Sequence, residues 1–168
     1  MNQDAPIEIV AYDPAWPRMF EEERARLEAA IAPWVTGGIH HVGSTAVPGL
    51  AAKPVIDVLA GVGSLDASRA SFAPLKQLDY DYAPYREQEM HWFCKPSRSY
   101  RTHHLHLIPT ASERYREELA FRDALRADPS IARDYEQLKR VLADSYRHDR
   151  EAYTDAKAGF VAEVLAGT

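Results

Sequence analysis

Three short runs of apolar or alternating residues most constrain how this chain can fold. They cover residues 39–43, 55–62 and 102–108, and turn-forming Gly, Pro or Ser residues lie beside each run. Runs of this length and composition are typical of β-strands rather than helices. Because segments with apolar residues at helical spacing lie between and around them, we expect one mixed β-sheet flanked by helices, an α+β fold.

Helix signals frame these strands in the first half of the chain. Asp13-Pro14 combines a capping side chain with a proline at the first helical position, so a helix is expected from there to about residue 32. Ser64 can cap a second helix that reaches about residue 78. Further short strands are expected over residues 7–12, 80–85 and 91–95.

The last third of the chain is expected to be helical. Thr110-x-x-Glu113 is a capping box, and Asp128-Pro129 begins another helix. The terminal helix carries a stripe composed of Tyr153, Ala156, Lys157, Phe160, Val161, Val164 and Leu165. Acidic and basic residues are mixed throughout this third, so its charges are interpreted as solvated helix faces.

Composition limits the class of protein. The chain has 168 residues, 46% hydrophobic and 27% charged, which predicts a single globular domain over residues 1–168. A net charge of −5 argues against binding to duplex DNA or to anionic membranes, but a small phosphate-bearing ligand is compatible with it. The single cysteine, Cys94, lacks a disulfide partner and is interpreted as a small buried side chain.

The predicted compartment is the cytoplasm. Residues 1–9 contain neither the basic residues nor the apolar run of a secretory signal. No apolar stretch approaches the roughly 20 residues that a membrane span needs. A lone cysteine is also typical of a reducing compartment.

Charge is distributed unevenly along the sequence. Two stretches contain no Asp or Glu: residues 29–56, which end just before Asp57, and residues 90–112. Together they hold six of the seven histidines. If these stretches fold side by side, an acidic protein acquires a basic, histidine-lined cleft. The alternative is that both are central strands, which are poor in acidic residues because they are buried.

The segment from Gly43 to Asp57 is the most informative for chemistry. A strand ends at Gly43, the hydroxyls of Ser44 and Thr45 and nearby backbone N–H groups could donate to phosphate oxygens, and the chain returns as a strand that bears Asp57. A carboxylate beside a phosphate is useful mainly when a divalent cation joins the two. An ordinary tight turn would also contain Gly, Ser and Pro, so both interpretations stay open.

Several motifs together resemble the GrpB family. They are HVGSTAVPGLAAKPVID at residues 41–57, RTHHLHL at 101–107, FRDALR at 121–126 and YDPAWP at 12–17, with Tyr135-x-x-Leu138-Lys139 and Tyr153-x-x-x-Lys157-x-x-Phe160 in the helical third. The resemblance spans nearly the whole chain. It implies a nucleotidyltransferase-like mixed sheet flanked by helices. Some family members are fused to a dephospho-coenzyme A kinase domain, but this chain lacks the Gly-x-x-x-x-Gly-Lys-Ser/Thr loop of such a domain.

The resemblance also implies a carboxylate-based site, from which this chain departs. The resemblance places the chain in the nucleotidyltransferase superfamily. The pattern of that superfamily is Gly-Ser followed by Asp-x-Asp or Asp-x-Glu on the next strand. Gly43 and Ser44 match the first part and Asp57 matches the second carboxylate, which makes Asp57 the candidate catalytic residue. Val55 occupies the position of the first carboxylate and supplies no oxygen. Tightly held magnesium normally needs at least two carboxylates.

The strand over residues 102–108 could compensate for this loss. Alternation places His104, His106 and Ile108 on one face and His103, Leu105 and Leu107 on the other. A His-x-His pair projects two imidazoles in parallel. With Asp57 as third ligand, His104 and His106 would suit zinc, manganese or iron better than magnesium. Alternatively, these histidines form local hydrogen bonds or contact a phosphate directly.

Basic residues near these strands are candidates for phosphate binding. Lys53 precedes Asp57, and Lys95, Arg98 and Arg101 lie on or near the turn before residue 102. Arginine suits bidentate phosphate recognition and lysine supplies a point charge. The predicted phosphate or nucleotide ligands are Gly43, Ser44, Thr45, Lys53, Arg98 and Arg101. Glu87 and Glu89 are further candidates for the missing carboxylate.

Two classes of function follow from these residues. The first is an enzyme that transfers a nucleotidyl or phosphoryl group, in which Asp57, His104 and His106 hold a metal ion. The second is a catalytically inactive module that binds a nucleotide or metabolite and has lost a carboxylate at Val55. The partner expected in both cases is a small phosphate-bearing molecule; the acceptor substrate, base preference and oligomeric state are not encoded in any motif.

Overall fold

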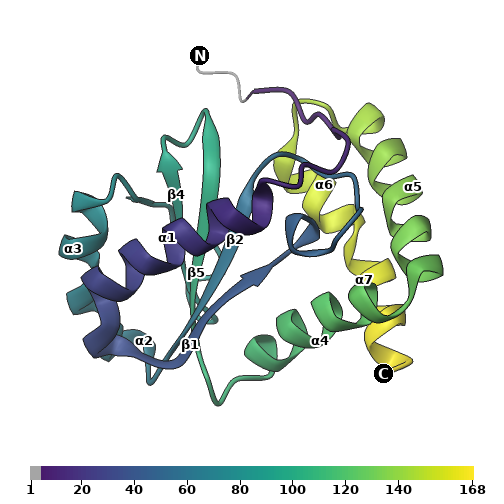
Figure 1. The fold of residues 1–168 in the computed structure, drawn as a ribbon. Coiled ribbons are helices and arrows are strands. Elements are labelled where there is room, and N and C mark those ends of the chain that lie inside the picture. The colour runs from purple at the N-terminus through teal and green to yellow at the C-terminus, as the bar shows by residue number, and fades with distance from the viewer. Residues whose placement is uncertain (1–4) are drawn as a thin grey trace.

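A five-stranded mixed sheet lies at the centre of the molecule (Figure 1). The structure is a computed structural model and describes residues 5–168; residues 1–4, part of the segment expected to lack a secretory signal, lie outside that range. The strands are β1 (Val35–Val42), β2 (Ile56–Val62), β3 (Asp81–Tyr82), β4 (His91–Pro96) and β5 (Arg101–Pro109). Their order across the sheet is β1-β2-β5-β4-β3. The predicted α+β class, with three neighbouring strands, is confirmed.

Among the strand pairs that residues 5–168 form, only β2 and β5 are parallel; the other neighbouring strands are antiparallel. In this central pair Asp57 lies beside His104, and Leu59 lies beside His106. On the other side of β2, Val42 at the end of β1 pairs with Asp57. The register therefore brings the Gly43 turn, Asp57 and the His-x-His motif to one region of the sheet.

Helices cover both faces of the sheet. They are α1 (Trp16–Ile31), α2 (Leu65–Ser68), α3 (Phe72–Gln77), α4 (Glu113–Ala127), α5 (Pro129–Ser145), α6 (Arg150–Ala156) and α7 (Ala158–Ala166). Figure 1 shows α1 to α3 on one side and the helices α4 to α7 gathered beside the β1 half of the sheet. Within residues 5–168, no helix is both long and apolar enough to cross a bilayer.

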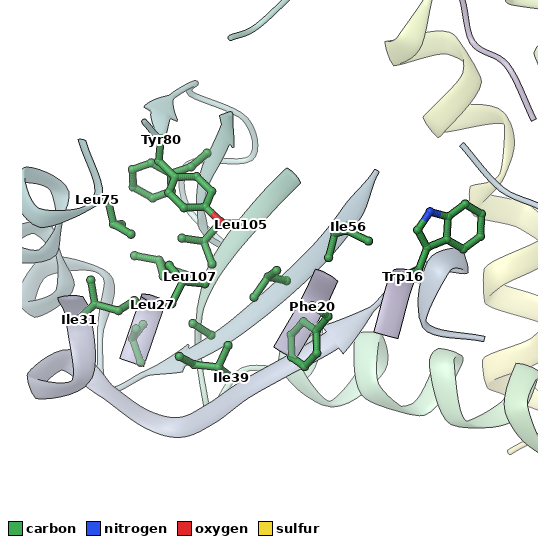
Figure 2. Packing of buried hydrophobic residues seen from close by; sticks show 14 of the residues in the cluster. Trp16, Phe20, Leu27, Ile31, Ile39, Ile56, Leu75, Tyr80, Leu105 and Leu107 are labelled. Carbon is green, nitrogen blue, oxygen red and sulfur yellow. The ribbon is translucent and has the colours of Figure 1, made fainter. Parts of the chain in front are cut away.

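The main core lies between α1 and the sheet (Figure 2). Leu27 and Ile31 of α1 pack with Leu105 and Leu107 of β5, and all four side chains are fully buried. Ile108 belongs instead to a smaller cluster with Leu119 of α4 on the opposite face. The predicted alternation along β5 is confirmed, so His104 and His106 share the face of Ile108, away from the main core.

Several predicted boundaries were wrong for local reasons. The capping residue of α4 is Ser112, whose hydroxyl accepts a hydrogen bond from the Tyr115 N–H at 3.3 Å. Thr110 lies outside the helix, and its N–H donates to the Val62 carbonyl at the end of the sheet. The helix begun by Ser64 breaks after α2, where the hydroxyls of Ser68 and Ser71 donate back to carbonyl oxygens three residues earlier.

Three further predicted elements also differ from the structure. Residues 7–12 contribute only one isolated bridge, Val10 with Ala52, and the strand expected over 80–85 is the two-residue β3. The terminal helix is interrupted at Lys157, which separates α6 from α7.

Candidate functional site

The turn that follows β1 is packed directly against Asp57. Gly43 has a φ of +73°, and a Cβ built on it would lie 2.4 Å from Oδ2 of Asp57. Only glycine combines this left-handed backbone with so close an approach. The prediction that Gly43-Ser44 and Asp57 lie at the same end of the sheet is confirmed.

Asp57 fixes the orientation of His104 and the ring nitrogen that carries its proton. Oδ1 of Asp57 lies 2.9 Å from Nδ1 of His104. Burial lowers the pKa of His104 to about 4 despite this carboxylate. Burial works to raise the pKa of Asp57, but the His104 hydrogen bond and nearby positive groups lower it to about 2. A neutral His104 therefore donates its Nδ1–H to the Asp57 carboxylate, and its buried Nε2 has no hydrogen-bond partner in the described part of the chain.

His106 is engaged by a different carboxylate. Its Nδ1 lies 3.2 Å from both carboxylate oxygens of Glu118, and Glu118 also pairs with Arg114 at 3.3 Å. Burial opposes protonation, but Glu118 raises the pKa of His106 above its usual value. Arg114 in turn pairs with Glu89, one of the additional carboxylate candidates. His106 of β5 and Glu89, which precedes β4, are therefore joined through Glu118 and Arg114 of α4 in one ion-pair chain.

The predicted metal ligands are not gathered around one point in this arrangement. Among residues 5–168, no three His, Cys, Asp or Glu side chains are placed to hold a common ion. Imidazoles that bind metals commonly donate the other ring nitrogen to a carboxylate, as His104 and His106 both do. However, Asp57 and Glu118 are occupied in these bonds, so a third ligand is missing. The zinc, manganese or iron site stays a prediction.

Two lysines, Lys53 and Lys157, meet at one aromatic ring, that of Tyr153. The Nζ atoms of Lys53 and Lys157 lie 4.9 and 4.2 Å from the ring centroid of Tyr153. Burial lowers the pKa of Lys157 to about 7, with Lys53 contributing in the same direction and Asp57 opposing it. Burial likewise lowers the pKa of Lys53, again opposed by Asp57. Within the described part of the chain, neither ammonium group has a carboxylate within 4.0 Å.

A third lysine, Lys139 of α5, fixes the loop that carries Lys53. Its Nζ donates to the Ala51 carbonyl at 2.6 Å, while Glu136 one turn earlier accepts from the Ala51 N–H at 2.8 Å. Tyr135 of the same helix is hydrogen-bonded to Ser44, which partly offsets the burial that raises the pKa of Tyr135. The helix therefore holds both the loop after Gly43 and the loop before Asp57.

Lys139 gives the stability of the free protein a defined pH dependence. Burial first, then Lys53 and Arg140, lower its pKa to about 7 against the effect of Glu136, whereas an unfolded lysine titrates near about 10.4. Between these values the unfolded chain binds more protons than the folded protein, so the free energy of unfolding should rise with pH. Urea unfolding at pH 7, 8 and 9 measures this slope. Lys139→Met should reduce the slope, and an unchanged slope would contradict the assignment.

Each of the other predicted phosphate ligands contacts a different part of the structure. Thr45 is buried and donates to the Val55 carbonyl at 3.2 Å, so its hydroxyl has a structural partner. Arg98 pairs with Asp81 and the Tyr82 carbonyl at the far edge of the sheet. Arg101 stacks on Trp92, with its guanidinium carbon 5.0 Å from the ring centroid.

Lys95 crosses to the other face, where its Nζ lies 2.6 Å from the buried Glu23 of α1. The charge of Lys95 is therefore paired with a buried carboxylate on the face of α1. Of the predicted ligands, the structure places Gly43 against Asp57, with Ser44 next in the chain, and Asp57 and Arg101 both influence the pKa of Lys53.

The sequence interpretation missed Lys139, Tyr153 and Lys157. Lys139 is 2% exposed and Tyr153 is fully buried, so the expectation of solvated charges on the terminal helices was wrong for Lys139. A signal was present, because Lys157 falls within the apolar stripe of the terminal helix. A lysine at such a position either extends to solvent or has a specific use.

Comparisons with known proteins agree with the resemblance seen in the motifs. A family model described as GrpB protein matches residues 6–166. A UPF0157 protein of Pseudomonas aeruginosa is 44% identical over 170 residues, covering 96% of this chain and 67% of that protein. The glutamate-rich protein GrpB of Alkalihalophilus pseudofirmus is 35% identical, covering 94% and 92%. A crystal structure of the conserved protein GrpB from Enterococcus faecalis superimposes with a TM-score of 0.84 at 30% identity, covering 95% and 96%.

Proposed function

The chain belongs to the GrpB family, and on this basis we propose that it binds a small phosphate-bearing ligand, such as a nucleotide, beside Asp57. The observation that carries the proposal is the pair of lysines on the Tyr153 ring, Lys53 and Lys157, neither of which has a carboxylate partner within residues 5–168. Their positive charge is the feature of the site that most needs a counterion.

Electrostatics supports an anionic ligand at this position. Removing an ammonium group from water is unfavourable unless a negative charge compensates it, and lowered lysine pKa values are the expected sign of that cost. Asp57 is the carboxylate that raises the pKa of both lysines, but it is already hydrogen-bonded to His104. A phosphate would supply the missing charge, and the Ser44 hydroxyl would be a further donor to it.

Nucleotidyl transfer is the second candidate function. Gly43, Ser44 and Asp57 favour it because they match the superfamily pattern and lie together. Val55 argues against it, since a single carboxylate cannot organise the metal ions that such transfer uses. Pyrophosphate released from ATP with magnesium, manganese or zinc, when water takes the place of the acceptor and attacks the α-phosphorus, would support transfer, because a binding module releases none.

Calorimetric titration with ATP tests the proposed binding. Lys53→Met should weaken binding at least about tenfold, because it removes a charge-assisted contact while keeping the length of the side chain. Lys76→Met on the exposed surface of α3 is the matched control and should bind like the wild type. Equal affinities of Lys53→Met and the wild type, with both proteins folded by circular dichroism, would rule out this site.

A further inference from the structure

The hydroxyl of Tyr153 has no hydrogen-bond partner within residues 5–168, although the residue is fully buried. Buried tyrosine hydroxyls usually find a partner, and leaving one unpaired is costly. Burial raises the pKa of Tyr153, and Tyr135 and Asp57 raise it further, so the hydroxyl stays protonated and lies within electrostatic range of Asp57. Its unused proton therefore needs an acceptor atom near the lysine pair.

The charges around this hydroxyl specify what kind of acceptor fits. Lys53, Lys139 and Lys157 influence one another electrostatically, and Asp57 is the carboxylate that acts on all three. His104 is neutral beside Asp57, and the charge of His106 is balanced by Glu118. Two ammonium groups, those of Lys53 and Lys157, lie against one ring, and neither has a carboxylate within 4.0 Å in residues 5–168. A ligand group that carries two negative charges can compensate both of them.

Resting on the proposed phosphate binding, we infer that the site takes the terminal dianionic phosphate of a phosphomonoester, with the Tyr153 hydroxyl donating to one phosphate oxygen. Lys53 and Lys157, held against the same ring, supply the positive charge. A phosphodiester carries only one negative charge and has an ester group in place of one anionic oxygen. It would leave part of the lysine charge uncompensated.

Methyl phosphate and dimethyl phosphate test the selectivity for a dianion. Both are small and lack a base, so they report on the phosphate site alone. Titrations of the wild-type protein at pH 7.5 should give at least about tenfold tighter binding for methyl phosphate, because the dianion forms the additional charge-assisted contact. Equal affinities for the two esters would overturn the inference without any variant being made.

Tyr153→Phe tests the role of the hydroxyl. This variant keeps the ring that contacts both lysines and removes only an unpaired group, so thermal unfolding should show unchanged or higher stability. Methyl phosphate should bind about tenfold more weakly to the variant, while the weaker binding of dimethyl phosphate should change less. Wild-type affinity for methyl phosphate in Tyr153→Phe would assign the hydroxyl a purely structural role and overturn its part in the inference.

The proposed function can fail separately. If the wild-type protein binds neither ATP nor methyl phosphate, phosphate binding itself is wrong. If ATP binds and Lys53→Met weakens it, but methyl and dimethyl phosphate bind equally, phosphate binding stands and the preference for a terminal dianion is wrong.

Discussion

Lys157→Glu should abolish phosphate binding and at the same time raise the thermal stability of the free protein. The substitution replaces an attractive contact with a repulsive one, so ATP affinity should fall by roughly 100-fold or more. The free protein loses the repulsion between Lys157 and Lys53, which together with burial lowers the pKa of Lys157. Because the side chain is only partly buried, the gain in stability should be no more than about 1 kcal/mol.

A loss of ATP affinity together with a gain in thermal stability distinguishes a ligand-binding residue from one that makes a structural contact. Differential scanning fluorimetry and calorimetry on the same preparations measure both quantities. Lys76→Glu, an equal charge change on α3, should alter neither by a comparable amount. A variant that loses stability together with binding would indicate that Lys157 serves mainly to hold α6 and α7 in place.

Gly43→Ala should destabilise the fold strongly. The new Cβ would meet Oδ2 of Asp57 and would require an alanine at a positive φ. Gly49→Ala is a matched control, because Gly49 also has a positive φ, of +82°, but a Cβ there has no neighbour within 4 Å. We expect Gly49→Ala to cost about 1–2 kcal/mol from backbone strain alone, and Gly43→Ala to cost roughly 2 kcal/mol more.

Chemical denaturation of the two glycine variants gives the comparison directly. The excess cost at Gly43 should come with displacement of Asp57 from His104, which the His104 ring signals in an NMR spectrum would report. Equal destabilisation in Gly43→Ala and Gly49→Ala would show that the Asp57 contact relaxes without cost, and that the turn after β1 does not depend on this close approach.

The parts of the site predicted from the sequence are those governed by short-range patterns. Alternation on β5 placed Leu105 and Leu107 in the core and His104 on the opposite face, because side chains of a strand alternate whatever surrounds it. The Gly43 turn and Asp57 were expected at one end of the sheet because two adjacent antiparallel strands return the chain to that end.

The parts that could not be predicted depend on packing between distant segments. Lys139 and Tyr153 lie on helices, and which helix face is buried depends on how these helices dock against the loops at residues 47–54. The separate carboxylate partners of His104 and His106 also required knowing that Glu118 of α4 reaches β5. Nothing in the spacing of the histidines indicates which acid each of them meets.

The single parallel pair in the sheet has a consequence for folding kinetics. β1 with β2, and β4 with β5, are antiparallel neighbours close in the chain, whereas Asp57 and His104 are 47 residues apart along it. Closing a long loop is slower than forming a hairpin, so the two antiparallel halves can form before they dock through β2 and β5. The Asp57–His104 contact lies on this seam. Amide hydrogen exchange that monitors refolding should therefore show protection at β2–β5 later than within either half, and the Asp57–His104 pair would form only as the two halves dock.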